Sequence, residues 1–145
     1  MTLDPYLTAA PVIQIHASAA LLALVLGPFA LFRRRRDRLH KVAGYVWVVA
    51  MTVGALSSVF ITSFGVIGPF SPLHLLAVLV LWSLLHGMRR IFAGDVAGHR
   101  KTMRGLYLHG LIVAGLLNFM PDRTTNRWFF AETPELGWVV IAVGL

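Results

Sequence analysis

Residues 9–32 read AAPVIQIHASAALLALVLGPFALF, and the four residues that follow, 33–36, are all arginine. An apolar stretch of about 20 residues is long enough to cross the hydrocarbon core of a bilayer as a helix. The arginines end it sharply, because guanidinium groups are costly to place in hydrocarbon. The stretch therefore predicts a transmembrane helix over 9–32, with a kink where Gly27-Pro28 interrupts the helical hydrogen bonds near its end.

Three further apolar runs occupy residues 42–64, 72–91 and 103–121, and each has nearly the length of a membrane span or more. The Ser71-Pro72 pair before the second of these runs is typical of a helix start, with serine as the cap and proline as the first helical residue. We expect an all-α fold, an integral membrane four-helix bundle in which short connections make consecutive helices antiparallel neighbours.

The C-terminal segment 136–145 is also apolar but is too short to span a bilayer unaided. It is either an interfacial helix or a partial fifth span. A length of 145 residues suits one domain, so residues 1–145 are expected to form a single transmembrane domain.

The composition supports a membrane location and limits the chemistry. Hydrophobic residues make up 57% of the chain and the mean hydropathy is +0.74, so a soluble protein of this size would expose too much apolar surface. The chain has no cysteine, which excludes disulfides, thiolate metal sites and covalently attached c-type haem. Any metal or cofactor must be held by histidine, carboxylate, methionine or backbone groups.

The net charge of +7 does not indicate nucleic-acid binding, because the basic residues are concentrated at helix ends. Eleven of the thirteen lysines and arginines lie in two segments, 33–41 and 89–104, where they suit anionic lipid headgroups. The positive-inside rule places both segments in the cytoplasm and the N-terminus in the periplasm. We therefore expect a multi-pass protein of the bacterial inner membrane that is in contact with membrane lipids.

Six histidines are the main chemical feature of the chain, because ionisable residues in membrane spans are rare and usually face the bundle interior. His16 and His74 lie near the periplasmic ends of the first and third predicted helices, which are diagonal in the bundle. His40 and His99 lie just before the second and fourth predicted helices, the other diagonal, at the cytoplasmic face.

Two histidines on facing helices of a bundle can hold haem iron. The depths predict an outer site at His16 and His74 and an inner site at His40 and His99. The pair His86 and His109, in the inner halves of the third and fourth helices, is the alternative inner site. The competing interpretation is that all these side chains only hydrogen bond to backbone, neighbouring helices or headgroups. No catalytic motif is present, so no catalytic residue is assigned.

Several stretches of the chain resemble a bacterial family of predicted four-helix membrane proteins of unknown function. These stretches are IQIHASAALLALVLGP (13–28), RLHKVAGYVWVVAM (38–51), SSVFI (57–61), GPFSPLHLL (68–76), GDVAGHRKTM (94–103) and LYLHGLIVAG (106–115). They cover most of residues 13–123. The resemblance implies histidines at the positions of His16, His40, His74 and His99, and so favours His40 and His99 as the inner pair.

The chain departs from this family pattern in three places. Lys41 stands where arginine is usual, and Pro121-Asp122-Arg123 replaces Pro-Gly-Arg. His109 stands where a small residue is usual, which indicates a site particular to this member on the fourth helix.

The layout of one histidine per helix is similar to that of di-haem transmembrane b-type cytochromes of the cytochrome b-561 and ferric-reductase kind, by analogy of layout. We therefore expect a haem b-binding protein that passes electrons across the membrane, with a quinol or a periplasmic donor. The alternative is a cofactor-free accessory subunit of a larger membrane complex, respiratory or photosynthetic, or a homo-oligomer. A histidine-based sensor or a metal- or quinone-binding protein is a third interpretation.

Overall fold

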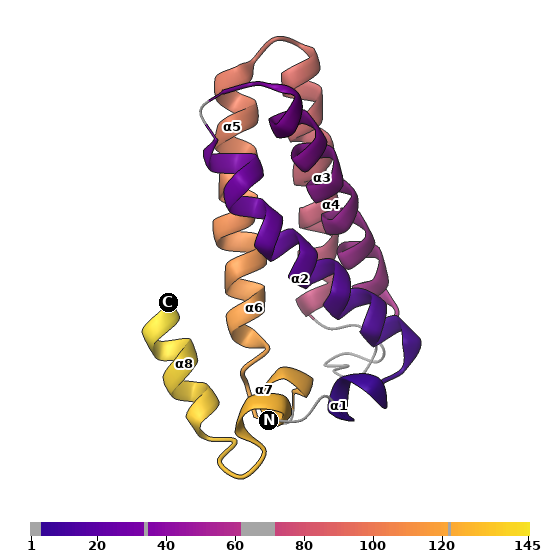
Figure 1. The fold of residues 1–145 in the computed structure, drawn as a ribbon, viewed down its shortest axis with the longest axis vertical. Helices are drawn as coiled ribbons and strands as arrows, with labels where there is room; N and C mark the ends of the chain where they lie inside the picture. Colours follow the sequence, from indigo (N-terminus) through magenta and orange to yellow (C-terminus); the bar gives the residue numbers. More distant parts are fainter. Residues whose placement is uncertain (1–3, 34, 62–71, 122) are drawn as a thin grey trace.

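The computed structural model describes residues 4–33, 35–61, 72–121 and 123–145, and the regular structure in these ranges is helical (Figure 1). In chain order the helices are α1 (Asp4–Leu7), α2 (Pro11–Phe32), α3 (Arg38–Val59), α4 (Pro72–Phe92), α5 (Val96–Gly105), the π-helix η1 (Leu106–Ile112), α6 (Val113–Leu117), α7 (Thr124–Phe130) and α8 (Leu136–Gly144). The described ranges contain no strand. The all-α fold class is thus confirmed.

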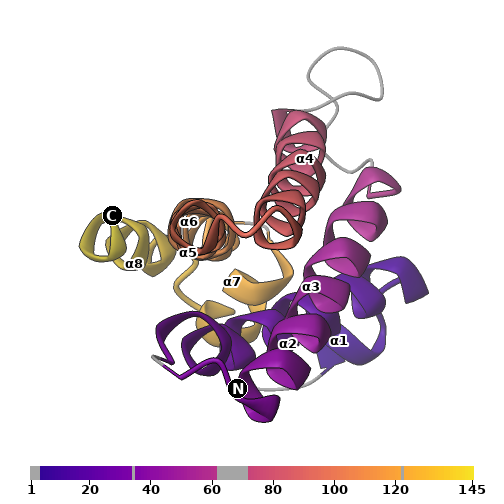
Figure 2. The ribbon, with the colours of Figure 1, turned by 90° about the horizontal axis from the view of Figure 1, so that it is seen from above.

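The long helical segments form a bundle in which neighbours in the sequence pack side by side (Figures 1 and 2). The pair α2 and α3 is the most extensive, α3 also packs on α4, and α4 packs on α5. The π-helix η1 contacts α2 and closes the bundle. Between their described residues α2 does not pack on α4, and α3 does not pack on α5, so the predicted diagonals are confirmed.

Three helices in the described ranges are long and apolar enough to cross a membrane, and they cover Pro11–Phe32, Arg38–Val59 and His74–Phe92. The fourth predicted span, 103–121, falls on α5, η1 and α6, which follow one another without a gap over residues 96–117. That this segment crosses the membrane stays a prediction. The last apolar segment is α8, which lies beside α6 (Figure 1).

The helix α3 begins at Arg38, four residues before the predicted start at 42. The carboxylate of Asp37 causes the early start, because its Oδ1 accepts the backbone N–H of His40 at 2.9 Å. Such a cap pairs one of the amide groups that the first turn of a helix leaves open. The sequence predicted His40 just before this helix, whereas the structure places it in the first turn of α3.

The same correction applies to the fourth segment. The helix α5 begins at Val96 and not at 103, because Asp95 Oδ1 accepts the backbone N–H of Gly98 at 2.8 Å. His99, predicted to lie just before the fourth helix, is thus in the first turn of α5. An N-capping aspartate within a charged segment is compatible with a helix start as well as with a loop.

The other ends of these two segments come earlier than predicted. The α3 helix ends at Val59 and not at 64, because the N–H of Phe60 turns back to the carbonyls of Ser57 and Ser58. Residues 62–64 lie outside the described ranges. The helix of the fourth segment ends at Leu117 and not at 121. It ends there because the next three amides, 118–120, bond to carbonyls three residues back instead of four.

The predicted start of α4 at Pro72 is confirmed. A proline at the first helical position loses no hydrogen bond, because that amide has no partner within the helix. The predicted cap, Ser71, lies outside the described ranges.

The interior of the bundle is built from small side chains around one large one. Ala23 and Ala30 are buried between helices, and Trp47 is 1% exposed. Small residues let helix backbones approach closely. Large apolar side chains instead point outward, for example Phe29 at 66% and Trp82 at 63% exposure. This distribution requires an apolar solvent around the bundle, because so much exposed apolar surface would drive association in water.

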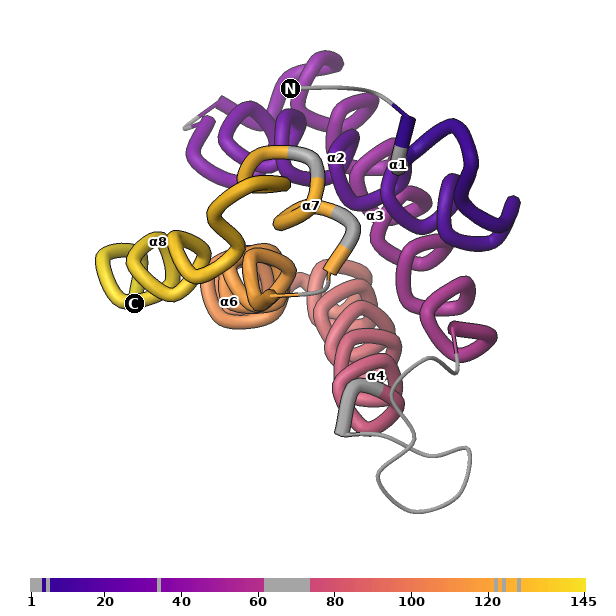
Figure 3. Tube along the Cα trace, turned by 90° about the horizontal axis from the view of Figure 1, so that it is seen from below, coloured from indigo at the N-terminus to yellow at the C-terminus, as the bar shows by residue number. Residues whose placement is uncertain are grey.

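The short helices α1 and α7 meet at one end of the bundle (Figure 3). Asn126 of α7 is fully buried, and its Nδ2 donates to the carbonyls of Phe119 at 2.7 Å and Pro134 at 2.8 Å. The side chain thereby fixes α7 to the segments before and after it. Gly137 completes the junction, since a Cβ there would overlap the Phe119 carbonyl oxygen.

Candidate functional site

The two ends of the bundle carry different chemistry. We call the end at which α3 and α5 begin the basic end, which lies at the top of Figure 1. The end with α1 and α7 is the opposite end. His40 and His99 lie at the basic end, in the first turns of α3 and α5, whereas His16 and His74 lie toward the opposite end.

His99 is half-buried and held by a backbone carbonyl of the neighbouring helix. Its Nδ1 lies 2.8 Å from the carbonyl oxygen of Gly87 on α4, so Nδ1 carries the proton in this contact. This hydrogen bond fixes the ring orientation and the tautomer, and it leaves Nε2 as the nitrogen with a lone pair. Histidines that ligate metals are commonly oriented in this way by a carbonyl.

His40 has a ring nitrogen without a protein partner. Its Nδ1 is buried, and it forms no hydrogen bond with any other residue in the described ranges. The indole Nε1 of Trp47, seven residues farther along the same face of α3, is in the same condition. Buried polar atoms normally have a partner. The interior side of α3 toward the basic end therefore carries two buried nitrogens without a hydrogen-bond partner among the described residues.

The capping carboxylate near His40, that of Asp37, is ionised. The guanidinium of Arg33 donates to Asp37, with Nε at 3.1 Å from Oδ1, and the N–H of His40 donates to the same carboxylate. Both donors favour the charged form, so the pKa of Asp37 is held well below its usual value. The pKa of Arg33 is correspondingly raised by this hydrogen bond. The first turn of α3 is thus fixed by an ionised cap at all ordinary pH values.

The two histidines of the predicted outer pair both bind the last turns of α3. His16 Nδ1 lies 2.9 Å from the carbonyl oxygen of Gly54 and 3.4 Å from Ser57 Oγ. His74 uses Nε2, which lies 3.1 Å from the carbonyl oxygen of Val59. Val59 is the last residue of α3, so its carbonyl lacks a helical partner. His16 leaves Nε2 out of its hydrogen bonds, as His99 does, whereas His74 engages that nitrogen in capping α3.

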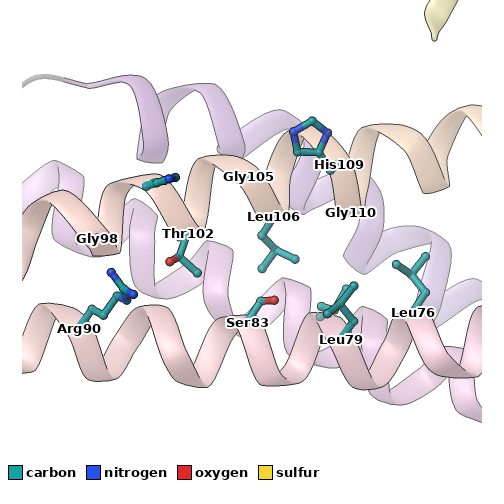
Figure 4. Close-up of a pocket in the computed structure, with 12 residues that line it drawn as sticks. Leu76, Leu79, Ser83, Arg90, Gly98, Thr102, Gly105, Leu106, His109 and Gly110 are labelled. Carbon is teal, nitrogen blue, oxygen red and sulfur yellow. The ribbon is translucent and has the colours of Figure 1, made fainter.

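The alternative inner pair is more exposed. His86 is exposed, and its Nε2 accepts a hydrogen bond from Arg90 Nε at 2.8 Å. His109 is also exposed and lines an open groove of about 450 Å³ between α4 and the α5–η1 segment (Figure 4). His86 does not line this groove.

Within the described ranges, no three histidine, cysteine or carboxylate side chains gather where they could hold a metal ion. Haem makes a smaller demand, since two axial histidines suffice. The donor chemistry suits such a group best at the basic end, because His99 has its tautomer fixed with Nε2 unused and His40 has a buried nitrogen without a protein partner.

Sequence reasoning missed two side chains that tie the fourth segment to α2. The Tyr107 hydroxyl donates to the Leu24 carbonyl at 3.1 Å, and Arg104 Nε donates to the Leu31 carbonyl at 3.1 Å. Arg104 also lies over the ring of Phe32, 5.1 Å from its centroid. A proline inside a helix is the signal that could have predicted such a donor, because it frees the carbonyl four residues earlier.

Comparison with known proteins places the chain in a family. No curated protein and no solved structure matches it. A family model described as a predicted membrane protein, DUF2306, matches residues 13–144. The match covers the candidate spans from residue 13 onward and all the histidines discussed above. The expected membrane class and the expected likeness to a family of predicted membrane proteins are thus confirmed, while four spans and a cytochrome-like layout stay predictions, and the chain belongs to the DUF2306 family of predicted membrane proteins.

Proposed function

We propose that this membrane protein binds b-type haem within its helical bundle and transfers electrons across the membrane. The inner site is at His40 and His99, and a second site is at His16 and His74. The proposal rests above all on one observation, the hydrogen bond from His99 Nδ1 to the Gly87 carbonyl, which presents Nε2 as a ligand nitrogen. Haem bound at these residues would supply one-electron chemistry.

The residues of the basic end would orient and enclose such a group. Asp37 caps α3 and so fixes the backbone at His40, while Asp95 caps α5 and fixes the backbone just before His99. The buried nitrogens of His40 and Trp47 would gain the polar partner that they lack within the described ranges. These contacts favour the basic end over the opposite end, where His74 Nε2 is engaged by the Val59 carbonyl.

The proposal includes an orientation and partners. The basic connections 33–41 and 89–104 lie in the cytoplasm of a bacterial cell, the N-terminus lies in the periplasm, and the protein is in the inner membrane. The predicted fourth span, 103–121, is the fourth crossing of the membrane and runs through η1 and α6, with the basic residues of α5 at its cytoplasmic end. A quinol or a periplasmic donor gives electrons at one face, and an acceptor takes them at the other.

The test is a reduced-minus-oxidised visible spectrum and a pyridine haemochrome assay on protein made with ample haem and purified in mild detergent. We expect a b-type spectrum from the wild type. His99→Ala and His40→Ala should each lose the haem of the inner site and so lower the haem content. His86→Ala is the matched control, because that side chain is exposed and should leave the spectrum unchanged. His16→Ala and His74→Ala then report on the second site.

Protein without haem under these conditions would contradict the proposal. The chain would then be a cofactor-free accessory subunit of a larger membrane complex or a homo-oligomer, and co-purification from native membranes would identify its neighbours. Equal loss of haem in His86→Ala and His99→Ala would also contradict the assignment, because it would show a general effect on folding and not ligation.

A further inference from the structure

The groove between α4 and the α5–η1 segment is separate from the two histidine pairs proposed to hold haem, and its chemistry changes along its length. Arg90 lines it near the basic end (Figure 4), and Lys101, which precedes Thr102 in α5, lines it as well. Leu76 and Leu79 line it farther toward the opposite end. The groove is thus cationic where the bundle would meet the headgroups and apolar where it would meet hydrocarbon.

The cationic end has features that suit the binding of an anion. Arg90 is held in place by Asp95, whose Oδ2 lies 3.0 Å from Nη1, and by His86. Gly98 leaves the space for this contact, since a Cβ there would overlap Arg90 Nη1. Lys101 is exposed and has no ion pair with any residue in the described ranges. Its ammonium is therefore the available cation at this end of the groove.

Two hydroxyl groups continue the groove below the cations. Ser83 and Thr102 point toward each other's helices into the gap (Figure 4), and neither forms a hydrogen bond with another residue in the described part of the chain. The serine and threonine hydroxyls of α2 and α3 are paired, as Thr52 is with the Val48 carbonyl at 2.8 Å. An unpaired hydroxyl at membrane depth is costly. The groove thus offers two hydrogen-bond donors to an occupant.

The π-helix forms the apolar part of one wall. Leu106 and Gly110 belong to η1 and line the groove, as does His109, whose ring is drawn on the side of η1 away from α4 (Figure 4). Single π-helical turns inside α-helices are rare and occur often at binding sites. Here the irregular turn coincides with the groove and contains His109, but it contains no histidine of the two pairs proposed to hold haem.

We propose that this groove is a specific site for one anionic phospholipid. The phosphate binds Lys101 and Arg90, the ester carbonyls accept hydrogen bonds from Thr102 and Ser83, and an acyl chain lies along Leu79. The order of charge, hydroxyl and apolar surface along the groove matches the order of phosphate, ester and chain in a phospholipid. Basic pockets between transmembrane helices bind anionic lipid headgroups in this manner.

The test is native mass spectrometry of the detergent-purified full chain, titrated with phosphatidylglycerol or phosphatidylcholine of the same acyl chains. We expect one phosphatidylglycerol to be retained in preference to phosphatidylcholine. Lys101→Ala should weaken that retention about fivefold, the factor expected for one basic residue near an anionic headgroup. Lys41→Ala is the matched control, because Lys41 is an exposed lysine outside the groove.

A second variant separates the ester contacts from the charge. The double change Ser83→Ala and Thr102→Val should lower retention of both lipids, because the esters are common to them. Equal retention of the two lipids by the wild type would overturn the proposal, as would equal effects of Lys101→Ala and Lys41→Ala. Displacement of the lipid by a neutral quinone would also overturn it. Haem content read from the same samples keeps this outcome separate from the electron-transfer proposal.

Discussion

The Tyr107 hydroxyl donates a hydrogen bond to the backbone carbonyl of Leu24 across the helix interface, at 3.1 Å. That carbonyl would ordinarily accept the N–H of residue 28, but residue 28 is proline and has none. A polar group left open in hydrocarbon is costly, and transmembrane helices tolerate proline where a neighbouring helix supplies the missing partner. The helix α2 therefore continues through Pro28 to Phe32.

We predict that Tyr107→Phe destabilises the protein by about 1 kcal/mol, because it leaves the Leu24 carbonyl without a donor. The measurement is unfolding in mild detergent followed by circular dichroism. Tyr45→Phe is the control, since Tyr45 is 56% exposed. Equal stability of the two variants would show that the carbonyl finds another donor.

A second prediction concerns the glycine beside Pro28. A Cβ on Gly27 would overlap the Tyr107 ring, whereas a Cβ on Gly44 of α3 would meet nothing within 4 Å. Gly27→Ala should therefore destabilise the bundle by about 1–3 kcal/mol through overpacking. Gly44→Ala should be neutral or stabilising, because alanine favours the helix more than glycine does. The midpoints of thermal unfolding in detergent decide between them, and a neutral Gly27→Ala would refute the tight packing inferred here.

A third prediction concerns the junction at the opposite end. Asn126→Ala removes two hydrogen bonds, to the Phe119 and Pro134 carbonyls, and should destabilise this region by about 2 kcal/mol. We expect faster hydrogen exchange in α7 and α8 with little change in α2 and α3. Asn118→Ala is the control, because no hydrogen bond of its side chain holds this junction. Uniformly faster exchange throughout the chain would instead show that Asn126 stabilises the whole fold and not only this junction.

A fourth prediction follows from the ionised cap of α3. The pKa of Asp37 is lowered by Arg33 and by the His40 N–H, so its stabilising contribution is present above the unfolded pKa of about 3.9 and is lost as the pH falls through the folded value. The difference in melting temperature between wild type and Asp37→Ala should be constant from about pH 8 to pH 5. It should shrink only below about pH 4.

Asp37→Asn separates the two roles of this side chain. Asparagine caps helices about as well as aspartate, and an exposed ion pair contributes little. The variant should therefore retain most of the wild-type melting temperature. A loss as large as that of Asp37→Ala would assign the effect to the contact with Arg33. A wild-type advantage that vanished near pH 6 would indicate control by a histidine.

Much of the fold could be predicted from the sequence, because a chain in a bilayer must place apolar side chains in the hydrocarbon and pair its backbone groups there. Apolar runs of sufficient length predicted α2, α3 and α4, since backbone groups in hydrocarbon must pair within a helix. The starts of α3 and α5 were misplaced, because Asp37 and Asp95 act through local hydrogen bonds that hydropathy does not register.

The histidines show the same division at the candidate site. Their type, number and depth came from the sequence, whereas the partner atom of each ring did not. His99 and His74 both occupy the first turn of a helix, yet one binds through Nδ1 and the other through Nε2. Which nitrogen remains available depends on how α3, α4 and α5 pack, and no local pattern encodes that.

The sequence by itself determined that this protein is a helical membrane protein, because the length and apolarity of its segments leave no other way to pair the backbone in lipid. Only the tertiary structure decided that Tyr107 completes the helix at Pro28 and that Ser83 and Thr102 share one groove. Such contacts join residues distant in the chain, and their geometry arises when helices pack against one another.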